Sequence, residues 1–220
     1  MFLGDMNYFQ ILFWPGGGYI GMLLWMLSVV MVAIIITNAL LIRRSTVIPD
    51  NIRQQVQQLF QAKQYREAIE FTSAEPSYFS FLVHAGLSNA PYGYAAMERA
   101  LLEASEDRTS RLLRYAEWLN LLGNIGPMIG LLGTVWGLIL TFFKIVDLGG
   151  VPDPGQLAGA IGIKLVCTLM GLVIAIPSLF TYGLMRNRLD TLAAEAIGSA
   201  QELIVQFRPG KKAAAIATAE

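Results

Sequence analysis

Apolar residues are gathered into three long stretches separated by more polar ones. These stretches cover residues 20–42, 119–146 and 158–185. A helix needs roughly 20 residues to cross a hydrocarbon core of about 30 Å, so each stretch is long enough to span a bilayer. The pattern therefore predicts three transmembrane helices.

The segments outside the spans also carry a helical pattern. Before the second span, apolar residues recur at three- and four-residue steps, as in Ile52, Val56, Leu59 and Phe60. Similar steps continue beyond the third span, and a helix over 158–207 would be about 75 Å long at 1.5 Å per residue. We therefore predict an all-α membrane protein in which two of the three transmembrane helices extend into a cytoplasmic helical bundle.

Lys and Arg residues near the span ends predict the orientation. Residues 1–20 contain none, whereas residues 43–118 contain nine, and Arg186 and Arg188 follow the third span. The N-terminus is therefore expected on the outer side, and residues 43–118 and the C-terminus in the cytoplasm.

This interpretation divides the chain into eight segments of alternating environment. They are an outer interfacial helix (1–19), the first transmembrane helix (20–42), a cytoplasmic helical domain (43–118), the second transmembrane helix (119–146), an outer loop (147–157), the third transmembrane helix (158–185), its cytoplasmic extension (186–207) and a flexible tail (208–220).

Composition supports a membrane protein. Of the 220 residues, 55 % are hydrophobic and 15 % are charged, whereas soluble domains carry about 25 % charged residues. The 16 basic and 16 acidic residues give no net charge. A nucleic-acid partner is not expected, because such surfaces need clustered excess Lys and Arg.

Small residues recur along the second and third spans at positions that allow close packing of helices. Helices in lipid associate through such packing, because they gain no hydrophobic energy by meeting. The candidate packing residues are Gly126, Gly130, Gly133, Gly137, Gly171, Ala175 and Pro177.

Threonines supply the polar groups of the same spans. Thr134, Thr141, Thr168 and Thr181 are candidates for a weakly polar pore lining. A threonine can instead bond to a backbone carbonyl one turn back in its own helix, and this alternative stays open for each of them.

Neither the second nor the third span contains Asp or Glu. An ion relay through a membrane normally uses an ionisable group. If this chain conducts ions, the carboxylate must therefore come from another polypeptide. No nucleophile–base pair, phosphate-binding loop or metal cluster is visible, so we expect no enzymatic activity, no metal and no cofactor.

Two motifs, GPMIGLLGTVWGLILTF at 126–142 and KLVCTLMGLVIAIPSLFTYG at 164–183, resemble those of the MotA/TolQ/ExbB proton channel family. The order of the segments is similar to that of the three-span TolQ/ExbB branch in particular. Thr134 and Thr168 match the pore threonines of the family.

The resemblance implies a bacterial inner-membrane protein whose outer side is the periplasm. It implies a homopentameric ring around two copies of a single-span ExbD/TolR-like partner that carries a transmembrane Asp. The transported ion would be H⁺, and a TonB- or TolA-like protein would pass the work to an outer-membrane or envelope process.

The chain departs from the family at Ile163 and Lys164, where ExbB-type members often carry a pore-side Glu. Lys164 can extend to the outer interface, as lysines near span ends commonly do, or it can face the pore and pair with a partner's carboxylate.

Two other functions are compatible with the pattern. A non-conducting oligomeric scaffold would use the glycines for packing only. A flagellar MotA-type stator is less favoured, because that branch has four spans and this chain shows three.

Overall fold

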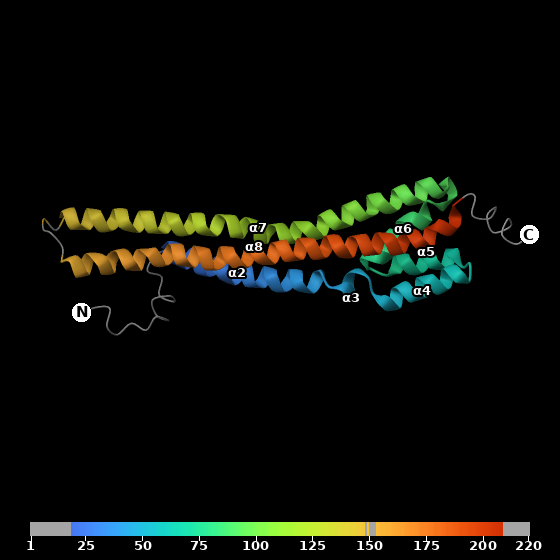
Figure 1. Cartoon of the computed structure of the whole chain (residues 1–220), viewed down its shortest axis with the longest axis horizontal. Helices are drawn as coiled ribbons and strands as arrows, with labels where there is room; N and C mark the ends of the chain where they lie inside the picture. Colours follow the sequence, from blue (N-terminus) through green and yellow to red (C-terminus); the bar gives the residue numbers. More distant parts are fainter. Residues whose placement is uncertain (1–18, 148, 150–152, 209–220) are drawn as a thin grey trace, which may run out of the picture. The chain divides into compact units, whose positions relative to one another are not determined.

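The computed structural model describes residues 19–147, 149 and 153–208. Most of the predicted N-terminal helix and of the predicted tail lies outside these residues. The described part contains helices and no strand, so the prediction of an all-α fold is confirmed. The elements in chain order are α2 (Tyr19–Leu41), α3 (Arg44–Val47), α4 (Asp50–Gln61), α5 (Tyr65–Ala74), α6 (Tyr78–Ser88), the 3₁₀ turn η1 (Ala90–Tyr92), α7 (Tyr94–Asp147), α8 (Pro154–Ile204) and the 3₁₀ turn η2 (Val205–Phe207) (Figure 1).

In the described part of the chain, three helices, α2, α7 and α8, are long and apolar enough to cross a membrane. Within the chain only 17 %, 22 % and 28 % of their most apolar windows are buried. Most of this apolar surface therefore needs lipid or other subunits to cover it. The prediction of a membrane protein with three transmembrane helices is confirmed.

The helix α8 begins at Pro154, four residues before the start predicted for the third span. Asp153 accounts for the difference, because its carboxylate accepts hydrogen bonds from the backbone N–H groups of Gly155 and Gln156 at 3.1 and 3.3 Å. An aspartate in this position satisfies N–H groups that lack partners in the first turn, and proline is well suited to the first helical position.

The chain forms two compact units, and α7 and α8 each pass through both. The first unit contains residues 19–37 and 116–184, which include the apolar parts of all three long helices. Within this unit α7 and α8 run side by side (Figure 1).

The second unit contains residues 38–115 and 185–208 of the described chain. Here α4 packs on α5, and α5 packs on α6. Completely buried side chains from α4, α6, α7 and α8 form its core, including Val56, Phe79, Leu82, Val83, Met97, Leu101, Leu189 and Ile204. The unit thus has a hydrophobic core of the kind that stabilises a water-exposed domain.

An aromatic cluster fixes the end of α8 within this second unit. The ring of Phe207 lies 4.9 Å from that of Tyr65 and 6.4 Å from that of Phe60, measured between centroids. Phe60 and Tyr65 contact each other edge to face at 5.8 Å. These distances are typical of favourable aromatic pairs, so the turn η2 is held against α4 and α5.

Candidate functional site

The backbones of α7 and α8 meet at glycines. An added Cβ on Gly130 would lie 2.7 Å from the carbonyl oxygen of Cys167, and one on Gly171 would lie 2.6 Å from that of Gly126. Side chains are not tolerated at such distances without movement of the backbone. Close approach of these two helices therefore requires glycine at Gly126, Gly130 and Gly171.

Two further glycines of the predicted set receive side chains. The position of Gly133 is covered by Ile20 of α2 and by Cys167, at 2.9 and 3.1 Å from a built Cβ. The position of Gly137 is covered by the aliphatic stem of Lys164, whose Cγ would lie 2.9 Å from a Cβ. The glycines of α7 thus form one continuous face against its neighbours.

Sequence reasoning missed Gly123, which belongs to the same face. A Cβ there would lie 2.6 Å from Cγ of Leu179 and 3.4 Å from the carbonyl oxygen of Ala175. Its spacing of three residues from Gly126 was the signal that could have identified it. Ala175 is itself buried, 4 % exposed, and Pro177 lies inside α8.

The structure brings Thr134 and Thr168 together between α7 and α8. The hydroxyl of Thr168 donates to the hydroxyl oxygen of Thr134 at 3.3 Å and lies 3.4 Å from the carbonyl oxygen of Gly130. Thr134 in turn donates to the carbonyl oxygen of Leu131 at 2.7 Å. Thr134 is only 4 % exposed, whereas Thr168 is partly exposed.

The other two predicted threonines do not join this pair. Thr141 donates to the carbonyl oxygen of Gly137 at 2.8 Å, within its own helix. Thr181 lies 13 residues after Thr168, which places it about 140° around α8 at 100° per residue. Of these four threonines, Thr134 and Thr168 form the pair between the two helices. Thr141 bonds one turn back in its own helix, and Thr181 lies on another face of α8.

Lys164 lies one turn before Thr168 on the same face of α8. It is the only charged residue between Asp153 and Arg186. Its aliphatic stem lies across Gly137 of α7. The uncharged run of α7 ends at Lys144, which is seven residues, or about 10 Å along the helix, beyond Gly137. The lysine therefore enters the packed interface between α7 and α8.

A comparison with known protein families matches residues 77–196, which include α6, α7 and most of α8, to the MotA/TolQ/ExbB proton channel family. The match covers more than half of the chain and includes every residue of the glycine and threonine contacts on α7 and α8. The chain belongs to the MotA/TolQ/ExbB proton channel family.

Several curated relatives of this MotA/TolQ/ExbB member are named ExbB. The biopolymer transport protein ExbB of Xanthomonas campestris pv. campestris is 30 % identical over 116 residues, which cover 53 % of this chain and 46 % of that protein. The biopolymer transport protein exbB1 of Vibrio cholerae is 30 % identical over 128 residues, covering 51 % and 56 %. ExbB of Neisseria gonorrhoeae is 29 % identical over 115 residues, covering 50 % and 51 %. The chain thus spans about half the length of these relatives.

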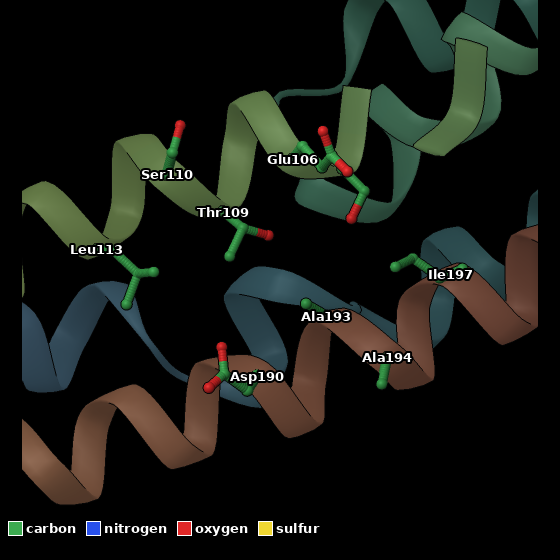
Figure 2. Close-up of a pocket in the computed structure, with 9 residues that line it drawn as sticks. Glu106, Thr109, Ser110, Leu113, Asp190, Ala193, Ala194 and Ile197 are labelled. Atoms are coloured by element: carbon green, nitrogen blue, oxygen red, sulfur yellow. The ribbon is translucent and has the colours of Figure 1, made fainter. Parts of the chain in front are cut away.

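Outside the spans, this MotA/TolQ/ExbB member has a cavity of about 420 Å³ between α7 and α8 in the second unit. Figure 2 shows residues of α7, such as Glu106 and Thr109, facing residues of α8, such as Asp190 and Ala193. The side chain of Glu106 is exposed. Within the described residues, no group of three or more His, Cys, Asp or Glu side chains is placed to hold a metal ion.

Proposed function

We propose that this protein is the channel-forming subunit of an ion-driven motor in the bacterial inner membrane, which converts ion-motive force into mechanical work on an envelope process. The observation that carries the proposal is the pair of hydroxyls, Thr134 and Thr168, between glycine-packed helices that contain no carboxylate. Family membership supports it, because the matched family is one of proton channels.

The missing carboxylate suggests the chemistry of the partner. A relay through the membrane needs a group that gains and loses a proton, and hydroxyls can only pass or orient one. We propose a single-span partner of the ExbD/TolR type whose transmembrane Asp passes the hydroxyls of Thr134 and Thr168. The relatives are named biopolymer transport proteins, which agrees with an energy-transducing role of the TonB or Tol type.

A ring of subunits would cover the exposed apolar faces of the three spans. Exposed side chains on α7 and α8 include Leu131, Val135, Leu165, Leu172 and Ile176. In a ring, some of these face neighbouring subunits and lipid, and others face an inner dimer of partners. We propose a homopentamer with the N-terminus in the periplasm and the basic 43–118 segment in the cytoplasm, as the distribution of Lys and Arg indicates.

The membrane potential provides enough energy to move a partner within the proposed ring. One elementary charge that moves through 100 mV releases about 2.3 kcal/mol. A few protons can therefore move a partner between packed positions, provided that the contacts are apolar and smooth. The proposed ion is H⁺, and we propose no cofactor.

Lys164 adds a charged group to the interface between α7 and α8. Its stem lies across Gly137 and it shares a face with Thr168. We propose that its ammonium pairs with the partner's carboxylate, because an ion pair in a medium of low dielectric constant stabilises both charges.

A non-conducting scaffold is the second candidate, and the burial of Thr134 favours it. Thr134 is 4 % exposed and its hydroxyl already donates within its own helix. In a scaffold these hydroxyls would only fasten α7 to α8.

Ion flux in a defined membrane separates the two candidates. The tagged chain is purified from its native membranes, and single-span proteins with a transmembrane Asp are identified by mass spectrometry. The complex is reconstituted into vesicles and proton uptake is followed with a pH-sensitive dye. Uptake that requires both proteins supports the motor, whereas an intact complex that moves no H⁺ or Na⁺ supports the scaffold.

A further inference from the structure

A second cavity, of about 350 Å³, lies in the second unit at the end of α2. Four parts of the chain form its walls: the end of α2, the short helix α3, the start of α6 with the residues before it, and α7. Among the described residues, two arginines and no acidic residue line the cavity. The cavity is lined by, among others, Leu41, Val47, Tyr78, Arg108, Arg111 and Leu112.

Arg108 is held in position by an aromatic ring. Its guanidinium carbon lies 4.6 Å from the centroid of the Phe81 ring, which is a cation–π contact. Its Nε is buried, and among the described residues it has no hydrogen-bond partner. A buried donor on a cation is costly without an acceptor, so an anion beside this guanidinium would be stabilising.

Arg111 adds a second cation on the same side of α7. It follows Arg108 by three residues, so the two side chains share a face of the helix. Its Nε forms an exposed ion pair with Asp107 at 2.9 Å, and a guanidinium carries further N–H donors beyond that one. Two guanidinium groups beside one cavity are well suited to a phosphate group, whose oxygens accept bidentate hydrogen bonds.

The cavity lies where the chain leaves the apolar spans. Leu41 is the last residue of α2, and Arg43 and Arg44 follow it two and three residues later. Tyr115, which also lines the cavity, precedes the uncharged run of α7 by a few residues. Aromatic and basic residues at this position are typical of the level of lipid headgroups.

The walls are apolar as well as cationic. Leu41, Val47 and Leu112 line the cavity together with the arginines. A ligand that matches both parts carries a phosphate and hydrocarbon chains. We propose that this cavity binds the phosphate headgroup of an anionic phospholipid, with Arg108 and Arg111 as its hydrogen-bond donors.

Lipid titration of the purified, delipidated full chain tests the proposal. Native mass spectrometry measures the affinity for phosphatidylglycerol and for phosphatidylcholine with the same acyl chains, since the choline group cancels the negative charge. We expect phosphatidylglycerol to bind about tenfold more tightly, the difference that one charge-assisted contact gives. We expect Arg108→Gln and Arg111→Gln each to remove most of this preference.

Three controls make the result specific. Arg66→Gln removes an exposed cation of α5 that does not line the cavity, and the preference for phosphatidylglycerol should survive it. Arg108→Lys keeps the charge but loses the planar donor pair, so its affinity should fall between those of the wild type and Arg108→Gln. Arg108→Gln also loses the contact with Phe81 and can therefore fail to fold. The side chain of Arg111 is 62 % exposed, so Arg111→Gln keeps the test valid in that case.

Equal affinity for the two lipids would overturn the proposal, and so would an Arg111→Gln variant that binds like Arg66→Gln. The last arm adds inorganic phosphate. If phosphate alone displaces bound phosphatidylglycerol and protects the protein from thermal unfolding to the same extent, the site takes a free phosphate compound and the assignment to lipid is wrong.

Discussion

The hydroxyl of Thr168 on α8 donates to the hydroxyl oxygen of Thr134 on α7 at 3.3 Å. This bond joins two helices across 34 residues of sequence, at the place where glycines let their backbones meet. It is a polar contact within a largely apolar interface, so it serves either ion movement or helix packing, and substitutions can separate the two roles.

Thr168→Val is expected to leave the oligomer intact and to reduce proton uptake about tenfold. A tenfold reduction corresponds to an increase of about 1.4 kcal/mol in the activation free energy of proton transfer. Valine has nearly the same shape and lacks the hydroxyl. The oligomer is measured by size-exclusion chromatography with light scattering, and uptake by the vesicle assay.

Thr168→Ser keeps a hydroxyl and should retain most of the uptake. Thr191→Val, at an exposed position where the hydroxyl of Thr191 donates to the carbonyl oxygen of Asn187 in its own helix, is the matched control and should change neither quantity. A Thr168→Val variant that no longer assembles would assign this hydroxyl to packing.

Gly130→Ala is expected to destabilise the contact between α7 and α8 by about 1–3 kcal/mol, because the new methyl group overpacks against backbone. A Cβ there would lie 2.7 Å from the Cys167 carbonyl oxygen and 3.1 Å from the Thr168 Cα. Thermal unfolding in detergent measures the loss. Gly162→Ala on α8 is the control, since nothing lies within 4 Å of its built Cβ, and equal unfolding of the two variants would contradict the assigned contact.

Lys164→Met tests the proposed ion pair with the partner. Methionine keeps an unbranched apolar stem against Gly137 and removes the charge. We expect the ExbD/TolR-type partner to be retained about tenfold less well on affinity resin, as loss of one partner of a buried ion pair is strongly unfavourable. Lys144→Met removes an exposed lysine of α7, and if it has the same effect, Lys164 has no special role.

Tyr78→Phe is expected to destabilise the second unit by about 1–3 kcal/mol, the effect of leaving buried hydrogen-bonding groups unsatisfied. The Tyr78 hydroxyl lies 2.7 Å from the Ser105 hydroxyl oxygen and 2.9 Å from that of Thr109. Chemical denaturation followed by circular dichroism measures the change. Tyr92→Phe, at a side chain that is 80 % exposed, should have almost no effect.

Ser178→Ala is expected to leave stability unchanged or to raise it by up to about 1 kcal/mol, because it removes a buried hydroxyl without a partner. Ser178 is 0 % exposed, and its Oγ makes no hydrogen bond to the described residues. Ser80 is also fully buried, but it bonds to Ser77, so Ser80→Ala should destabilise the protein. A clear loss of stability or of proton uptake in Ser178→Ala would show that this hydroxyl has a partner in the assembled complex.

Sequence periodicity placed the glycines of α7 on one face, because a helix places residues three and four apart on one side. It identified Gly126, Gly130, Gly133 and Gly137, which all contact α2 or α8. Gly123 was missed although it continues the same spacing. The orientation in the membrane, the pentamer and the pore-lining roles of the threonines stay predictions.

Contacts between distant segments could not be predicted from the sequence. Nothing in the sequence indicated that Arg108 would lie over Phe81 or that Arg108 and Arg111 would share a cavity with Leu41. Such contacts depend on how α2, α6 and α7 pack, and single-sequence patterns carry no information about packing register.

By itself, the sequence determined that this protein is helical, has three apolar spans and lacks a carboxylate in the second and third of them. Hydrophobicity and periodicity are local properties that can be read along the chain. The tertiary structure alone decided that Thr168 meets Thr134 and that Lys164 crosses Gly137. The reason is that the register between α7 and α8 is set where glycine backbones touch, and a shift by one residue would turn other side chains toward each other.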